Sequence, residues 1–268
     1  MVTREQNRSQ WTTHISSRRD DCPICHGTGF VDYPVDAYLI AKYGEMARDY
    51  KFVDFCQCRR KQTVQQRTEV SGLSEAMKRQ TFDTFRVDGN IQAELKKTAE
   101  GYLSALLDVK NHPFRPWMFV GGNPGSGKTH ICTAVCNELL KKGTGVKYMM
   151  WQQDSRKLKA LVNDYEYEDE IAPYLNVSVL YIDDLLKQRY TDVPEFTEGD
   201  IKIAFTILNS RYLQNKPTII SSEWTLDQLL RADEGVFSRV YERCREFTVH
   251  IPRETGSNFR LGGAKDAV

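Results

Sequence analysis

The 268-residue sequence has no hydrophobic run long enough to cross a membrane, which takes about 20 consecutive apolar residues. Its apolar runs, such as residues 117–120, have only the length of a buried strand. The N-terminus, MVTREQNRSQW, is polar and lacks the apolar core of a secretory signal. From these absences we expect a cytoplasmic protein with no membrane partner.

Neither sign of charge dominates, because 37 lysines and arginines and 36 aspartates and glutamates give a net charge of +1. A nucleic-acid-binding protein with a uniformly basic surface is therefore excluded, whereas a local basic patch is not. The seven cysteines are an odd number, and in a reducing compartment we do not expect disulfides. Four of them fall within the first 58 residues, which suggests two units with different chemistry.

From about residue 90 onward, helix-like and strand-like segments alternate. Apolar runs predict strands at 117–120, 146–151, 177–182, 218–221 and 246–251, and helical periods predict helices at 93–109, 131–140, 154–163 and 198–214. This alternation predicts an α/β fold, in which helices cover both faces of a parallel sheet. We expect a small N-terminal domain at 1–70, ending in a basic, helical linker, and a larger domain at 71–268.

Residues 122–129 fit the pattern G-x-x-x-x-G-K-[ST], and they lie between a predicted strand and a predicted helix, as the pattern requires. Its glycines let backbone N–H groups turn toward phosphate oxygens, and the helix N-terminus adds the positive end of its dipole. Lys128 is expected to reach the β- and γ-phosphates of ATP, and Thr129 to ligate Mg²⁺. The predicted nucleotide-binding residues of this loop are Gly122, Asn123, Pro124, Gly125, Ser126, Gly127, Lys128, Thr129 and His130.

Two later strands end in polar residues that suit the same site. An apolar run ends in Asp183 and Asp184, which we expect to hold Mg²⁺ and to act as the general base, respectively. Residues 216–221 lead into Ser222 and Glu223, either of which is a candidate sensor of the γ-phosphate, and Ser222 is the predicted nucleotide contact. A strand simply capped by polar residues is the alternative at 222–223.

With these motifs in place, residues 75–262 resemble the AAA+ ATPases of the bacterial and phage replicative helicase loader group, the DnaC/DnaI type, which is close to the IstB transposition ATPases. The resemblance rests on TFDTF at 81–85, GGNPGSGKTH, LYIDDL, LNSRY followed by KPTIISS, FSRV and NFRL. It implies a three-layer P-loop AAA+ domain. Only 17 residues follow Ile251, so a full C-terminal lid is not expected.

The resemblance also implies roles for arginines outside the loop. An arginine finger falls on Arg239, with Arg243 as the fallback, and a sensor arginine falls on Arg260. Because a finger acts on ATP bound to a neighbouring subunit, self-association through AAA+ interfaces is implied.

The implied function is the loading of a replicative hexameric helicase onto single-stranded DNA in replication initiation. ATP binding and slow, Mg²⁺-dependent hydrolysis would act as the switch. The alternatives are an IstB-like transposition helper and a non-catalytic ATP-binding adaptor.

The N-terminal cysteines form two close pairs, Cys22 with Cys25 and Cys56 with Cys58. Four thiolates in two pairs match a tetrahedral Zn²⁺ site, with His26 as a spare ligand because the C-x-C spacing of the second pair is tight. Redox chemistry would need a βαβ context that is missing here, and unliganded thiols are the other alternative. In the family that the sequence resembles, this region binds the helicase.

Three other features have simpler interpretations. Cys132 and Cys136 are expected to pack in the core, and the acidic run at 164–170 to form a solvated face. The basic stretch at 156–159, with Arg156, Lys157 and Lys159, lies where related initiator ATPases contact single-stranded DNA, which only suggests a DNA contact.

Overall fold

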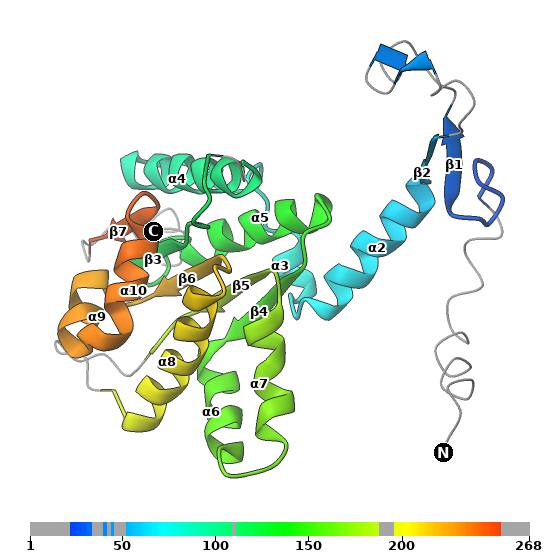
Figure 1. The fold of residues 1–268 in the computed structure, drawn as a ribbon. Coiled ribbons are helices and arrows are strands. Elements are labelled where there is room, and N and C mark those ends of the chain that lie inside the picture. The colour runs from blue at the N-terminus through cyan, green and yellow to red at the C-terminus, as the bar shows by residue number, and fades with distance from the viewer. Residues whose placement is uncertain are drawn as a thin grey trace, which may run out of the picture. The chain divides into compact units, whose positions relative to one another are not determined.

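A computed structural model describes residues 22–33, 40–41, 44–45, 52–108, 111–187 and 196–252 (Figure 1). The chain divides into two compact units, Met1–Gln66 and Arg67–Val268. Each unit is described by itself below. Arg260 and the expected truncation of the lid lie outside the described residues.

The first unit contains an antiparallel pair of strands, β1 (Phe30–Tyr33) and β2 (Phe52–Phe55), in which Phe30 lies opposite Phe55. The helix α2 (Gln57–Val70) begins directly after β2 and continues past the division between the units. The Arg59 guanidinium lies 4.6 Å and 4.2 Å from the ring centroids of Phe30 and Phe55, which joins the first turn of α2 to the strands by cation–π contacts. The helix expected over the basic stretch is thus confirmed, whereas the two strands had not been predicted.

The second unit is built on a parallel five-stranded sheet in the order β4-β5-β6-β3-β7. Its strands are β3 (Met118–Gly122), β4 (Val146–Met150), β5 (Val179–Asp183), β6 (Thr218–Ser222) and β7 (Thr248–Ile251). Each one lies at a run that the sequence predicted as a strand, so the α/β class is confirmed. Because β3, β5 and β6 are neighbours or next neighbours, the loops after their carboxyl ends meet at one edge, where α/β proteins bind ligands.

Helices cover both faces of this sheet (Figure 1). They are α3 (Glu75–Lys78), α4 (Asn90–Leu107), α5 (Lys128–Lys141), α6 (Trp151–Leu161), α7 (Tyr167–Asn176), α8 (Glu198–Leu213), α9 (Leu226–Ala232) and α10 (Glu234–Cys244). Alternate residues of β3 serve the two faces: Met118 and Val120 belong to the apolar cluster under α4 and α5, and Phe119 to the one under α6, α8 and α10. Cys132 and Cys136 are fully buried in the first cluster, as predicted.

The acidic run forms the solvated face that was predicted, because Asp164, Glu166, Glu168 and Asp169 are exposed, and its last three acids also belong to the helix α7. Glu168, Asp169 and Glu170 occupy its first turn, where negative side chains favour the positive end of the helix dipole. Ile171 follows and is buried in the second apolar cluster. The acidic run is therefore the start of a helix packed on the core.

One fully buried arginine joins three elements at the amino-terminal edge of the sheet. Arg211, on α8, donates to the Thr218 hydroxyl and to the carbonyls of Tyr174, Val177 and Pro217 at 2.6–3.1 Å. Burial lowers the pKa of the guanidinium to about 10. The side chain therefore supplies a charged donor to backbone acceptors at the end of α7 and before β6.

Candidate nucleotide site and cysteine cluster

The loop between β3 and α5 has the backbone that the motif predicts. Gly122, Gly125 and Gly127 have φ values of 117°, 76° and 94°, a left-handed region that favours glycine. At Gly122 a Cβ atom would also lie 2.0 Å from the carbonyl oxygen of Ile251 on β7, so no side chain fits there. The glycines therefore let the chain turn tightly from the strand into the N-terminus of α5.

Lys128 is folded back over this loop. Its ammonium donates to the carbonyl oxygens of Gly122 and Asn123, both at 2.8 Å, and the Ser126 hydroxyl donates to Asn123 at 2.7 Å. Burial lowers the pKa of Lys128, although nearby carboxylates oppose that effect. The ammonium thus lies inside the loop that is predicted to hold phosphates.

Asp183, at the end of β5, accepts hydrogen bonds from four hydroxyl groups. The donors are Ser221 at 2.5 Å, Tyr181 at 2.6 Å, Tyr148 at 3.0 Å and Thr129 at 3.1 Å. Burial, and after it the charge of Asp183, raises the pKa of Tyr181 well above its usual range, so this tyrosine is a neutral donor. The structure therefore brings together Thr129 and Asp183, the two residues predicted to share Mg²⁺.

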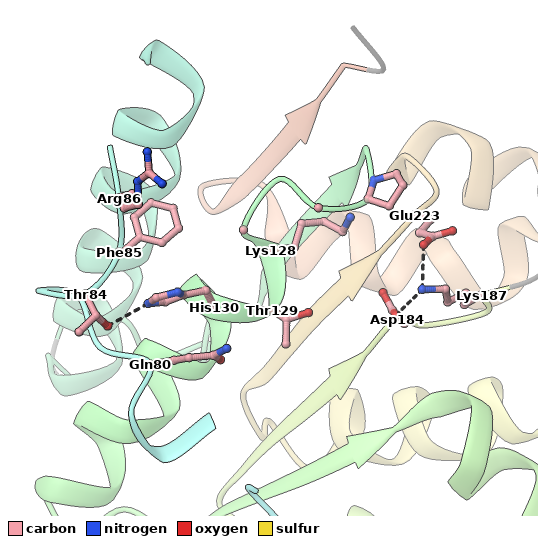
Figure 2. A pocket seen from close by; sticks show the side chains of 13 residues that line it. Gln80, Thr84, Phe85, Arg86, Lys128, Thr129, His130, Asp184, Lys187 and Glu223 are labelled. Atoms are coloured by element: carbon pink, nitrogen blue, oxygen red, sulfur yellow. Dashed lines mark hydrogen bonds and ion pairs between the residues drawn. The ribbon is translucent and has the colours of Figure 1, made fainter. Parts of the chain in front are cut away.

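Asp184 faces the pocket beside Lys187 and Glu223 (Figure 2). The ammonium of Lys187 lies 2.8 Å from Asp184 Oδ2 and 2.8 Å from Glu223 Oε1. The backbone N–H of Asp184 donates to the Ser221 hydroxyl at 3.0 Å. Ser221 thus contacts both acids, since the same hydroxyl donates to Asp183.

These residues line a pocket of about 300 Å³. Pro124, Gly125, Gly127, Lys128, Thr129, Asp184, Lys187 and Glu223 line one part, and Gln80, Thr84, Phe85, Arg86 and His130 line the other (Figure 2). His130 Nε2 lies 3.2 Å from the Thr84 hydroxyl and 3.1 Å from the carbonyl oxygen of Thr81. Gln80 Oε1 is buried and has no hydrogen-bond donor among the described residues. The pocket therefore has a charged end, and an end with the aromatic ring of Phe85 and the polar side chains of Gln80 and Thr84.

Two other predicted site residues, Ser222 and Arg239, are not among the residues that line this pocket. Ser222 is fully buried, and its hydroxyl donates to the carbonyl of Leu185 at 2.9 Å, so it does not line the pocket, whereas its neighbour Glu223 does. Arg239 lies on α10, where it donates to Gly235 one turn earlier and faces the ring of Phe205. It is not among the residues that line this pocket.

Arg243, the fallback finger, is held within its own unit. It donates to Asn215 Oδ1 at 3.0 Å and to the carbonyl of Tyr212 at 3.2 Å, and it lies over the Tyr212 ring. These contacts give it a structural role and leave Arg239 as the better-placed finger candidate.

In the first unit, the Sγ atoms of Cys22, Cys25, Cys56 and Cys58 all lie within 4.8 Å of one another. The Cys22–Cys56 and Cys25–Cys58 sulfur distances are 3.8 Å and 3.4 Å. A tetrahedral Zn²⁺ with Zn–S bonds of about 2.3 Å separates its sulfurs by about 3.8 Å. The backbone N–H of Gly29 also donates to the Cys25 sulfur at 3.3 Å, as in a site built for thiolates. The four cysteines therefore fit a zinc ion.

His26 does not belong to this cluster. Its side chain is exposed, and its φ of 47° places it in the tight turn that follows Cys25. The tight C-x-C spacing of the second pair is accommodated because Cys56 precedes α2 and Cys58 lies in its first turn.

Comparison with known proteins identifies the family. Residues 59–244, more than half of the chain, match the family described as IstB-like ATP binding protein. The chain belongs to this family. The match starts within α2, at residue 59, so the cysteine cluster lies before the IstB-like ATP-binding domain in the sequence.

Two relatives from Bacillus subtilis (strain 168) align with most of this IstB-like protein. It is 30% identical to the uncharacterized protein YqaM, over 90% of this chain and 86% of YqaM. It is also 30% identical to the phage-like element PBSX protein XkdC, over 92% of this chain and 88% of XkdC. Both alignments are long enough to include part of the N-terminal unit.

Among solved structures, the IstB-like protein is similar to the DnaC helicase loader, with a TM-score of 0.55 and 23% identity. That similarity covers 66% of this chain and 99% of the loader chain. It shows that the two chains share a fold, in agreement with the sequence resemblance. Within the described residues of the IstB-like protein, no helix is long and apolar enough to span a membrane.

Several site residues of this IstB-like protein had not been predicted. Tyr148 and Lys187 reach the acids from β4 and from the turn after β5, and Gln80 enters the pocket from the segment before α4. The only sequence signal for Gln80 was its place next to the TFDTF motif. Tyr148 had none, because its contact depends on the strand order.

Proposed function

We propose that this protein is an ATP-dependent loader of a replicative ring helicase onto single-stranded DNA, with ATP binding and hydrolysis as the switch. The observation that carries the proposal is that one chain combines a complete phosphate and magnesium site with a four-cysteine module. The likeness of its fold to a helicase loader and the phage-type relative XkdC support the same assignment.

The pocket suits ATP at both of its ends. The phosphates would occupy the loop at 122–129, where the Lys128 ammonium and the N-terminus of α5 supply positive charge. The adenine ring would lie toward Phe85, beside the polar side chains of Gln80 and Thr84. One pocket would thus offer positive charge to the phosphates and an aromatic ring to the purine base.

Thr129 and Asp183 are the residues that would hold Mg²⁺. An ion bound there withdraws electron density from the β- and γ-phosphate oxygens. The Thr129 hydroxyl would turn from Asp183 toward the metal, while Ser221, Tyr181 and Tyr148 keep the carboxylate in place. This second set of donors preorganises Asp183.

In hydrolysis, Asp184 would accept a proton from the attacking water as the water oxygen bonds to the γ-phosphorus. The bond from that phosphorus to the bridging oxygen breaks, and ADP and phosphate are the products. Asp184 Oδ2 is paired with Lys187, which leaves Oδ1 for the water. Arg239 of a neighbouring subunit would supply positive charge to the transferred group.

The N-terminal unit would bind the helicase, with a Zn²⁺ ion held by Cys22, Cys25, Cys56 and Cys58. Zinc binding contributes on the order of 10–16 kcal/mol to small domains of this kind, so the ion would also fold the unit. DNA would be contacted by the assembled ATPase domains. On α6, Lys157 and Lys159 are paired with Glu170 and Asp200, which leaves Arg156 as the more available cation of that stretch.

The test is reconstitution with a purified replicative helicase. We expect the full chain with ATP to co-purify with the helicase and to increase its deposition on circular single-stranded DNA, and a Lys128→Ala variant to fail in deposition. An IstB-like transposition helper would bind a transposase and ignore the helicase. A non-catalytic adaptor would bind the helicase and ATP, but its deposition activity would be unaffected by Asp184→Asn.

A further inference from the structure

The turn that follows β5 aims two polar side chains at the nucleotide pocket. Asp184 and Leu186 have φ values of 54° and 55°, which is unusual for residues other than glycine. The backbone N–H of Lys187 donates to the Asp184 carbonyl at 3.0 Å and closes the turn. Such backbone conformations cost free energy and occur where a site requires them.

Buried leucines and hydrogen bonds to its backbone hold this turn, and these contacts do not involve the Lys187 side chain. Leu185 and Leu186 are buried in the apolar cluster under α8 and α10. The Leu185 N–H donates to Ser221 at 2.8 Å, and the indole N–H of Trp224 donates to the Leu186 carbonyl at 3.1 Å. The fold of the turn therefore does not depend on the Lys187 side chain.

The Lys187 ammonium joins the carboxylates of Asp184 and Glu223, which follow the neighbouring strands β5 and β6 (Figure 2). Two of its three N–H groups are used in these ion pairs, and 31% of the side chain is exposed. Lys187 lines the pocket together with Lys128. Among the described residues the third N–H of Lys187 has no partner, so the ammonium can also donate to a ligand in the pocket.

The γ-phosphate of ATP must enter a region that already holds several carboxylates. Asp184 and Glu223 line the pocket, and Asp183 lies beside Thr129 at its edge. Like charges at such short range oppose binding, and ADP avoids this because it lacks the third phosphate. A cation between two of these acids offsets part of that repulsion.

We propose that Lys187 is a specificity-determining residue of the nucleotide site. It offsets the charge of Asp184 and Glu223 and donates to the γ-phosphate, so that the pocket distinguishes ATP from ADP. This inference rests on the proposed function of the pocket, and it names the residue through which an ATP switch would recognise the triphosphate.

The test compares Mg²⁺-dependent binding of ATP and of ADP to the full-length chain. For Lys187→Met we expect ATP affinity to fall tenfold or more, in line with the loss of a charge-assisted hydrogen bond of about 1.5–3 kcal/mol, while ADP affinity changes less than about twofold. Lys187→Arg should keep most of the ATP preference, because it keeps the charge. Glu223→Gln added to Lys187→Met should recover part of the ATP affinity, because one repelling carboxylate is neutralised.

Lys141→Met is the matched control, because it removes a lysine ion pair with Glu138 in the last turn of α5, outside the pocket. It should bind both nucleotides like the wild type. Equal losses of ATP and ADP affinity in Lys187→Met, or no loss of either, would overturn the inference while leaving the ATP site in place. A wild-type chain that binds neither nucleotide would overturn the proposed function as well.

Discussion

Lys128 and Asp184 line the same pocket but serve different stages of the proposed reaction. Lys128→Ala should abolish both ATP binding and turnover, because it removes the ammonium that lies inside the phosphate loop. Asp184→Asn should keep ATP bound and lower turnover by about 10²-fold or more, since it removes only the proton acceptor. Equilibrium ATP binding and phosphate release, measured on both variants, separate the two roles.

Glu223→Gln is the control for this comparison, because Glu223 shares the same lysine partner as Asp184. A larger loss of turnover in Glu223→Gln than in Asp184→Asn would reassign the general base to Glu223. Wild-type turnover by Lys128→Ala would show that the phosphate loop has been misassigned.

Among single residues, those that could be predicted belong to one continuous motif. Lys128 and Thr129 were identified because the loop chemistry needs them at fixed positions, and Asp183 because it ends an apolar run. Ser221 and Lys187 were not identified, because their roles come from contacts between neighbouring strands and across a turn with left-handed residues. No local pattern predicts such contacts.

Among the elements, the end of α7 and the starts of β5 and β6 depend on one side chain of α8. Arg211→Met should lower the free energy of unfolding by about 3 kcal/mol, because carbonyl groups at the end of α7 and before β6 lose a charged donor that the thioether cannot replace. Denaturant unfolding followed by circular dichroism measures the change. The exposed Arg245→Met is the matched control, and equal stability of the two variants would show that water or backbone shifts satisfy the carbonyls instead.

The strands were easier to predict than some of the helices. Buried parallel strands tend to be continuous apolar runs, and the fully buried β3, β5 and β6 follow this pattern most closely. By contrast, α7 contains Pro173 and begins with three acids, and the buried Ile171 alone gives no helical period. The strands β1 and β2 are four residues each, too short to show an alternating pattern.

At the scale of the whole molecule, the N-terminal unit is expected to depend on metal. The purified protein should contain one zinc per chain, and Cys22→Ser should lose the zinc and unfold residues 21–58 while ATP binding persists. The reason is that the four sulfurs would repel or oxidise without the ion that they surround. Elemental analysis and limited proteolysis measure these effects.

His26→Ala is the matched control for this prediction, because His26 lies beside Cys25 but is exposed and outside the cluster. It should retain the zinc. Chelator-free protein without zinc, or loss of zinc in His26→Ala, would contradict the proposed set of four cysteine ligands.

A second prediction at this scale concerns assembly. Arg239→Ala should bind ATP normally but hydrolyse it poorly, because Arg239 does not line its own pocket and is proposed to act on a neighbour. Mixing it with Lys128→Ala should restore part of the activity, since some interfaces then pair an intact Lys128 with an intact Arg239. Phosphate release at several mixing ratios measures the rescue. Its absence despite demonstrated co-assembly would mean that Arg239 acts within its own subunit or is structural.

The close contact between Gly122 and Ile251 of β7 is one of several contacts that link the phosphate loop to the end of α10. The helix α10, which carries Arg239, leads through Phe247 into β7, and backbone hydrogen bonds join this stretch to β3 from Trp117 to Asn123. The last of them, from the Asn123 N–H to the Ile251 carbonyl at 3.2 Å, attaches the phosphate loop itself. The backbones of Gly122 and Ile251 pack so closely that no side chain fits between them at residue 122. Backbone hydrogen bonds thus form a continuous connection between the end of α10, the helix that carries Arg239, and the phosphate loop.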